Sequence, residues 1–187
     1  MSSTATALAV IIIVLIVAAF VATIVARHRR TQELRRRFGP EYDRAVASGS
    51  GRRAGERDLR HRERRHDRLE LHELDPEQRR RYADQWQRTQ AHFVEEPEIA
   101  TRDADALVTR VMAERGYPVT EDFDTRAQDL SVEHAETLGH YREAHEISQA
   151  NERGQATTEQ LRQALMHYRA LFAELLGERP GGHPAPG

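Results

Sequence analysis

The chain has 187 residues, of which 39% are apolar and 31% charged, and its formal net charge is −2. It has no cysteine, which excludes a disulfide scaffold, a thiolate nucleophile, and zinc or iron–sulfur sites built on thiolates. Only one apolar run is long enough to cross a bilayer, which excludes a transporter or channel with several spans.

That apolar run covers residues 5–26 and is interrupted only by Thr6 and Thr23. As a helix, 22 residues would extend about 33 Å, which matches a hydrocarbon core of about 30 Å. The alternative is a cleaved signal peptide, but residues 1–4 carry no basic side chain and the run exceeds the usual apolar length. We therefore predict a single transmembrane helix at residues 5–26, preceded by a short extracytoplasmic N-terminus at residues 1–4.

Arginines are crowded on one side of this run only. They are Arg27, Arg29, Arg30, Arg35, Arg36 and Arg37. Because positive residues stay on the cytoplasmic side, we expect the N-terminus outside the cell membrane and the rest of the chain in the cytoplasm. The same six arginines would lie at the membrane interface, beside anionic headgroups.

The rest of the chain is divided by charge. Residues 27–68 hold 15 arginines and seven acidic residues, whereas residues 69–187 hold 13 arginines and 23 acidic residues. We expect a basic juxtamembrane segment at residues 27–51 that ends in a Gly/Ser-rich flexible joint. A solvated, arginine-rich helical spacer should follow at residues 52–68, and residues 178–187 should form a disordered tail.

Four segments between residues 69 and 177 repeat the spacing i, i+4, i+7, i+11, which places the repeated positions on one face of a helix. The sets are Tyr82, Trp86, Thr89 and Phe93; Ala100, Ala104, Leu107 and Val111; His134, Leu138, Tyr141 and His145; and Leu161, Leu165, Tyr168 and Phe172. Aromatic residues at this spacing indicate a core before they indicate a recognition face. We predict an all-α fold in which residues 69–177 form an acidic helical bundle.

Helix-terminus residues support these assignments. The expected starts are Asp75 with Pro76, Pro97, Ser131 and Thr157, and the expected ends include Gly116 and Gly177. A short additional helix is expected within residues 120–130, with Phe123 filling the core.

Catalytic signatures are missing from the sequence: it has no nucleophile elbow, phosphate loop, dinucleotide-binding glycine pattern or zinc-protease motif. His134 and His145 share a predicted helix face, but eleven residues separate them by about 16 Å, so they cannot bind one ion. We expect them to pack beside Leu138 and Tyr141. The sequence therefore predicts no enzyme, no cofactor and no metal site.

The arginine-rich spacer could contact phosphate or lipid. The candidate residues are Arg60, Arg62, Arg64 and Arg65. However, residues 52–68 carry a surplus of only four positive charges and no aromatic residue that could stack on a base. We therefore favour a solvated spacer over nucleic-acid binding.

Three segments carry a family resemblance: residues 37–46 with Phe38-Gly39-Pro40, residues 111–118 with Gly116-Tyr117-Pro118, and residues 167–172. Together with the apolar run they resemble a family of uncharacterised actinobacterial single-pass membrane proteins, over residues 5–176. The resemblance implies an N-terminal anchor and a helical domain, and no known activity. Within the first segment, Gly39 and Pro40 should break one helix and start another.

These observations favour a non-enzymatic, membrane-anchored helical protein that presents a cytoplasmic bundle to a protein partner, as a scaffold or adaptor. One alternative is a membrane-associated regulatory protein that binds nucleic acid or acidic lipid through its arginine-rich segment. Another is an enzyme whose active site in the bundle has no recognisable motif.

Overall fold

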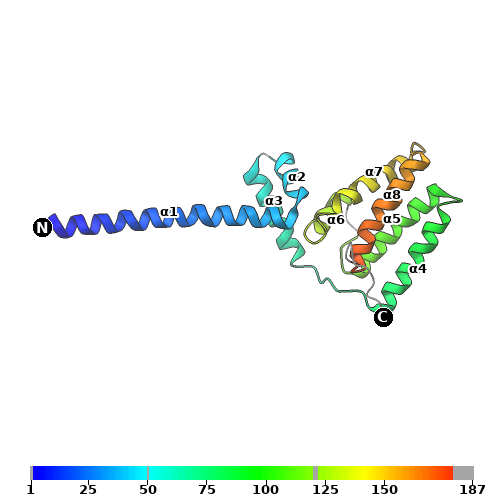
Figure 1. Ribbon diagram of the computed structural model, residues 1–187, viewed down its shortest axis with the longest axis horizontal. Helices are drawn as coiled ribbons and strands as arrows, with labels where there is room; N and C mark the ends of the chain where they lie inside the picture. The colour runs from blue at the N-terminus through cyan, green and yellow to red at the C-terminus, as the bar shows by residue number, and fades with distance from the viewer. Residues whose placement is uncertain (1, 50, 120–121, 179–187) are drawn as a thin grey trace, which may run out of the picture.

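The structure is a computed structural model that describes residues 2–49, 51–119 and 122–178, with side chains given for residue 13 and from residue 15 onward. These ranges contain eight α-helices and no strand, which confirms the predicted all-α class. One long helix, α1, projects from a body that contains the other seven (Figure 1).

Helix α1 (Ser2–Phe38) continues without a break from the apolar run through the six arginines. It ends at Gly39, whose φ of 45° is accessible to glycine, and Pro40 begins α2 (Pro40–Ser48). The predicted helix break is therefore confirmed.

Within the part of the chain that is described, no helix is both long enough and apolar enough to cross a membrane. The predicted span at residues 5–26 lies partly outside the residues whose side chains are described.

Helix α3 (Arg52–His66) differs from the prediction of a solvated spacer, because one of its faces is buried. Leu59 is fully buried, and a Cβ on Gly55 would lie 2.7 Å from the carbonyl oxygen of Ala45 in α2. The glycine allows the two helices to meet closely. One leucine suffices on α3 because neighbouring segments supply the other apolar side chains. This small core consists of Leu34, Phe38, Tyr42, Ala45, Leu59 and Val132. We call residues 34–66 the proximal unit.

The second and larger core lies in the bundle formed by α4 (Pro76–His92), α5 (Pro97–Glu114), α6 (Phe123–Leu130), α7 (Leu138–Glu152) and α8 (Thr158–Leu175). Trp86 of α4 is 2% exposed, and its ring centroid lies 4.8 Å from that of the fully buried Phe172 in α8. These aromatic residues belong to the core, as predicted.

The predicted helix ends agree with the structure in most places. Asp75 accepts hydrogen bonds from the backbone N–H groups of Glu77 and Gln78, and Thr157 closes a second capping box with Gln160. Pro97 begins α5, and Gly116 and Gly177 adopt positive φ after α5 and α8.

The predicted start of the third helix at Ser131 is wrong. Ser131 instead ends α6, with its hydroxyl donating a hydrogen bond to the carbonyl of Gln128 (2.6 Å). Residues 131–137 form turns and α7 begins only at Leu138, so His134 precedes the helix. The Glu174 carboxylate, which lies within hydrogen-bond distance of both His134 and Thr137, stabilises these turns.

Candidate functional site

The most unusual surface of the described chain is the apolar part of α1, residues 13–25. Its described apolar side chains extend into solvent, with exposed fractions between 43% and 65%. They are Ile13, Leu15, Ile16, Val17, Phe20, Val21, Ile24 and Val25. Such a surface costs free energy in water and normally marks contact with a membrane or another protein.

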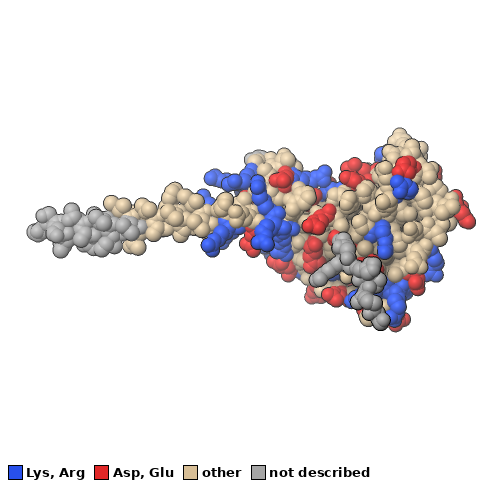
Figure 2. Space-filling model, viewed as in Figure 1, with Lys and Arg blue, Asp and Glu red and all other residues tan. Residues whose placement is uncertain are grey.

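The six arginines predicted to meet the membrane interface all lie exposed on α1, directly after this apolar surface. Figure 2 shows basic side chains gathered where the projecting helix joins the body. Arg35 places its guanidinium 5.0 Å from the ring centroid of Tyr42, and Arg37 forms an ion pair with Glu63 (3.2 Å). The arginine cluster is therefore partly ordered by contacts with α2 and α3.

A buried ionic contact joins the proximal unit to the bundle. Glu41 of α2 is 4% exposed, and its carboxylate accepts a hydrogen bond from Arg142 Nη2 of α7 (3.0 Å). Arg62 Nη1 of α3 lies 3.6 Å from the same Glu41 oxygen. Arg62 also contacts Asp58 at 2.6 Å. One carboxylate thus connects three helices, and its two arginine partners offset the cost of burying it.

Three further contacts lie along the same junction. Arg65 Nη2 of α3 pairs with the buried Asp129 of α6 (2.8 Å). Tyr117 donates a hydrogen bond to Glu133 (3.0 Å), and His66 Nε2 lies 3.5 Å from the same carboxylate. Burial and the Glu133 charge raise the pKa of Tyr117, so its hydroxyl stays protonated as a donor.

These contacts change the interpretation of the four arginines proposed to bind phosphate or lipid. Arg62 and Arg65 face the body and are engaged in ion pairs, whereas Arg64 is exposed and Arg60 is half-buried. The structure therefore does not present the four as one basic surface. The sequence could not reveal this, because Glu41, Asp129 and Arg142 are distant along the chain.

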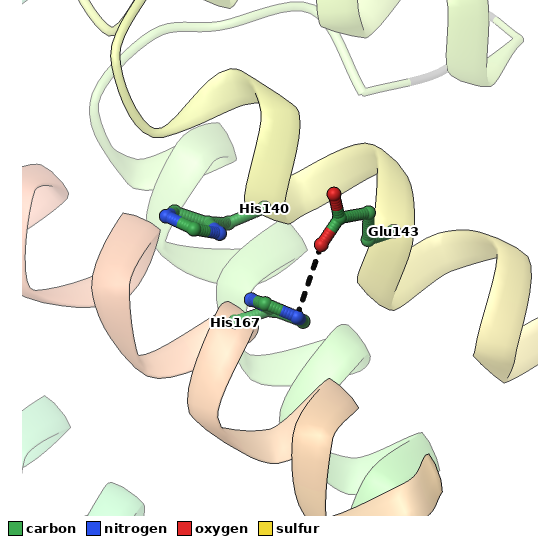
Figure 3. Close-up of side chains that lie close together, drawn as sticks. All are labelled: His140, Glu143 and His167. Carbon is green, nitrogen blue, oxygen red and sulfur yellow. Dashed lines mark ion pairs between the residues drawn. The ribbon is translucent and has the colours of Figure 1, made fainter.

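A different group of side chains comes together between α7 and α8: His140, Glu143 and His167 (Figure 3). Each offers one ligand atom, and these atoms all lie within 4.8 Å of one another. His167 Nε2 lies 3.1 Å from the Glu143 carboxylate, and the two imidazole rings stack with centroids 4.8 Å apart. Burial and the neighbouring His140 lower the pKa of His167, although Glu143 opposes the shift.

The sequence interpretation missed this cluster. His140 and Glu143 are spaced i, i+3 in a predicted helix, and His167 lies in another, but only the packing of α7 against α8 brings them together. The two histidines singled out from the sequence lie apart from the cluster. His134 Nδ1 contacts Glu174 at 2.8 Å, and His145 stacks on Phe123 with ring centroids 3.7 Å apart.

No protein-family model, curated protein or solved structure matches the chain. The resemblance to actinobacterial single-pass membrane proteins therefore stays a prediction.

Proposed function

We propose that the chain is a non-enzymatic, single-pass protein of the cell membrane, with its N-terminus outside and its helical body in the cytoplasm. The observation that carries the proposal is the exposed apolar surface of α1 between Ile13 and Val25. Insertion into lipid would remove this surface from water, at a gain of about 25 cal/mol per Å² of apolar area. The 22 apolar-rich residues at positions 5–26 provide the length required for a span.

The exposed arginines support the proposed orientation. They follow the apolar surface directly, where each could gain about 1 kcal/mol beside anionic headgroups. Because they lie on the C-terminal side of the span, the positive-inside rule favours a cytoplasmic body.

The junction between the proximal unit and the bundle supports a role as an adaptor. Glu41 and Arg142 link α2 to α7, so the bundle would be held at a fixed distance from the bilayer. A rigidly held, acidic bundle is suited to present a surface to a protein partner. The alternative, phosphate binding by the arginine-rich segment, is less well supported because Arg62 and Arg65 are paired within the chain.

Membrane insertion can be tested with the double variant Leu15→Arg/Phe20→Arg. Each arginine near the centre of the span should cost about 2.5 to 3.5 kcal/mol on insertion. We expect the full-length chain to resist alkaline extraction from membranes and the double variant to be released. Val94→Arg, at a position 85% exposed in the bundle, is the matched control and should stay in the membrane. Release of the unmodified chain would contradict the proposal.

Orientation and partner binding need separate measurements. A reporter that works only in the cytoplasm should be active when fused after Gly187, and activity of an export-only reporter there would reverse the topology. A photo-crosslinker at Val94 or Met166, both exposed on the body, should yield a discrete heteromeric product in intact membranes. If neither position yields a cross-linked product, the result would argue against an adaptor.

A further inference from the structure

The side chains of His140, Glu143 and His167 lie close together between two helices. His140 and Glu143 lie one turn apart on α7, and His167 faces them from α8 (Figure 3). Their ligand atoms lie within 4.8 Å of one another, and two of them are only 3.1 Å apart. Ligands of a tetrahedral zinc ion, bound at about 2.0 to 2.1 Å, are separated by about 3.3 Å. Side-chain rotations that turn the two stacked rings toward a shared point would bring all three into coordination distance.

The backbone beneath the cluster is fixed by the bundle core. Tyr141 and Tyr168, which directly follow His140 and His167, are both fully buried, and their rings meet edge to face at 6.2 Å. The ligands themselves remain accessible, because His140 and Glu143 are exposed and His167 is half-buried. Rigid anchor points under accessible donor atoms are the arrangement that a metal site requires.

The ligand chemistry favours a transition metal ion of the zinc class. Neutral imidazole and carboxylate bind zinc well, whereas calcium and magnesium require mostly oxygen ligands. The contact between His167 and Glu143 explains the position of these two residues, but it gives no reason for His140 to stack beside them.

We propose that His140, Glu143 and His167 bind one divalent transition metal ion, with zinc as the type case and water as the fourth ligand. The bound ion would connect α7 to α8 on the surface of the bundle. Because the site lies on the bundle and not on α1, its existence is independent of the proposed membrane anchoring.

The test is zinc binding by the purified full-length chain in detergent, measured by calorimetry after treatment with a chelator. We expect one zinc ion per chain and a higher melting temperature with zinc. His167→Ala and His140→Ala should each lower the affinity by more than about 100-fold, because second-shell changes alone typically cost 10- to 100-fold. His140 is exposed, so its variant tests the site even if His167→Ala were to perturb packing.

The matched control is His92→Ala. His92, the last residue of α4, forms a similar pair with Glu96, which directly precedes α5, and its Nε2 lies 3.4 Å from Glu96 Oε2. His92 belongs to no three-residue cluster among the described residues. Its removal should leave the affinity unchanged. Cobalt should give the visible absorption of a tetrahedral ion with the unmodified chain and lose it with His140→Ala. The proposal is overturned if the unmodified chain binds no stoichiometric zinc, if His92→Ala weakens binding as much as His167→Ala, or if magnesium stabilises the chain equally.

Discussion

Glu41 accepts a hydrogen bond at 3.0 Å from Arg142, a residue 101 positions later in the chain. This contact lies where the helix pair following α1 meets the bundle, and Arg62 approaches the same carboxylate from α3. The position of the bundle relative to α1 therefore depends in part on one buried acid and two arginines.

Replacing this acid by its neutral isostere should loosen the junction. In Glu41→Gln the side chains of Arg62 and Arg142, only 11% and 16% exposed, would lose their shared counter-charge. We expect a cost of about 3 to 5 kcal/mol, which is typical of a broken buried ion pair. Relative to the unmodified chain, amide hydrogen exchange in this variant should accelerate more in α2 and α3 than in α8. Asp43→Asn, an exposed acid on the same helix, is the control, and equal effects of both variants would contradict this prediction.

Close packing between α2 and α3 gives a second prediction. A Cβ at position 55 would meet backbone atoms of Ala45 and Val46 at 2.7 to 2.8 Å, so Gly55→Ala should force the helices apart and lower the free energy of unfolding by about 1 to 3 kcal/mol. In contrast, a Cβ added at Gly139 in α7 would meet no atom within 4 Å. Gly139→Ala should stabilise the protein by up to about 1 kcal/mol, because alanine has the higher helix propensity. Urea unfolding of both variants tests the contrast, and a tolerated Gly55→Ala would contradict the packing described.

Local patterns in the sequence predicted the bundle well and the junction poorly. The spacing that contains Trp86 and Phe172 predicted their helices, and both residues lie in the core. The single leucine of α3 predicts a solvated helix, but Gly55 and Leu59 suffice for burial when α1 and α2 provide the aromatic residues of the small core. Contacts such as Glu41 with Arg142, or His140 with His167, depend on how helices pack. No short sequence pattern encodes that packing.

The carboxylate of Glu174 should make stability depend on pH. Burial raises its pKa, but hydrogen bonds with His134 and Thr137 outweigh burial, so the pKa in the folded chain lies below the ordinary value of 4.5. A carboxyl group whose pKa is lowered by folding stabilises the folded chain at pH values above its ordinary pKa. This stabilisation is lost as the pH falls through the folded pKa. Glu174→Gln should therefore destabilise the protein at neutral pH, by about 1.5 to 3 kcal/mol. Below about pH 4 the difference in stability between Glu174→Gln and the unmodified chain should shrink, as measured by thermal unfolding. A difference that stays constant with pH would contradict this account.

The arginines of α3 can be separated into two pairs that should behave differently. Arg62 and Arg65 contact Glu41 and Asp129, which are both nearly fully buried, so Arg62→Gln/Arg65→Gln should lower the free energy of unfolding by about 1 to 3 kcal/mol per residue. Arg60→Gln/Arg64→Gln should leave stability unchanged within about 0.5 kcal/mol. Chemical unfolding compares the two double variants directly, and equal losses would contradict the division.

Arg60 and Arg64 also provide a test of whether α3 binds phosphate. If Arg60 and Arg64 contacted a nucleic-acid backbone, their removal would reduce the logarithmic salt dependence of duplex DNA affinity by about two units, since each contact contributes about 0.9. We expect no such change, because acidic residues such as Glu56 and Glu63 are interspersed along the same helix and repel phosphate. Affinity measured across a range of salt concentrations tests this expectation. A slope that falls by two units in Arg60→Gln/Arg64→Gln, and stays the same in the exposed-site control Arg153→Gln, would favour the regulatory alternative over the adaptor.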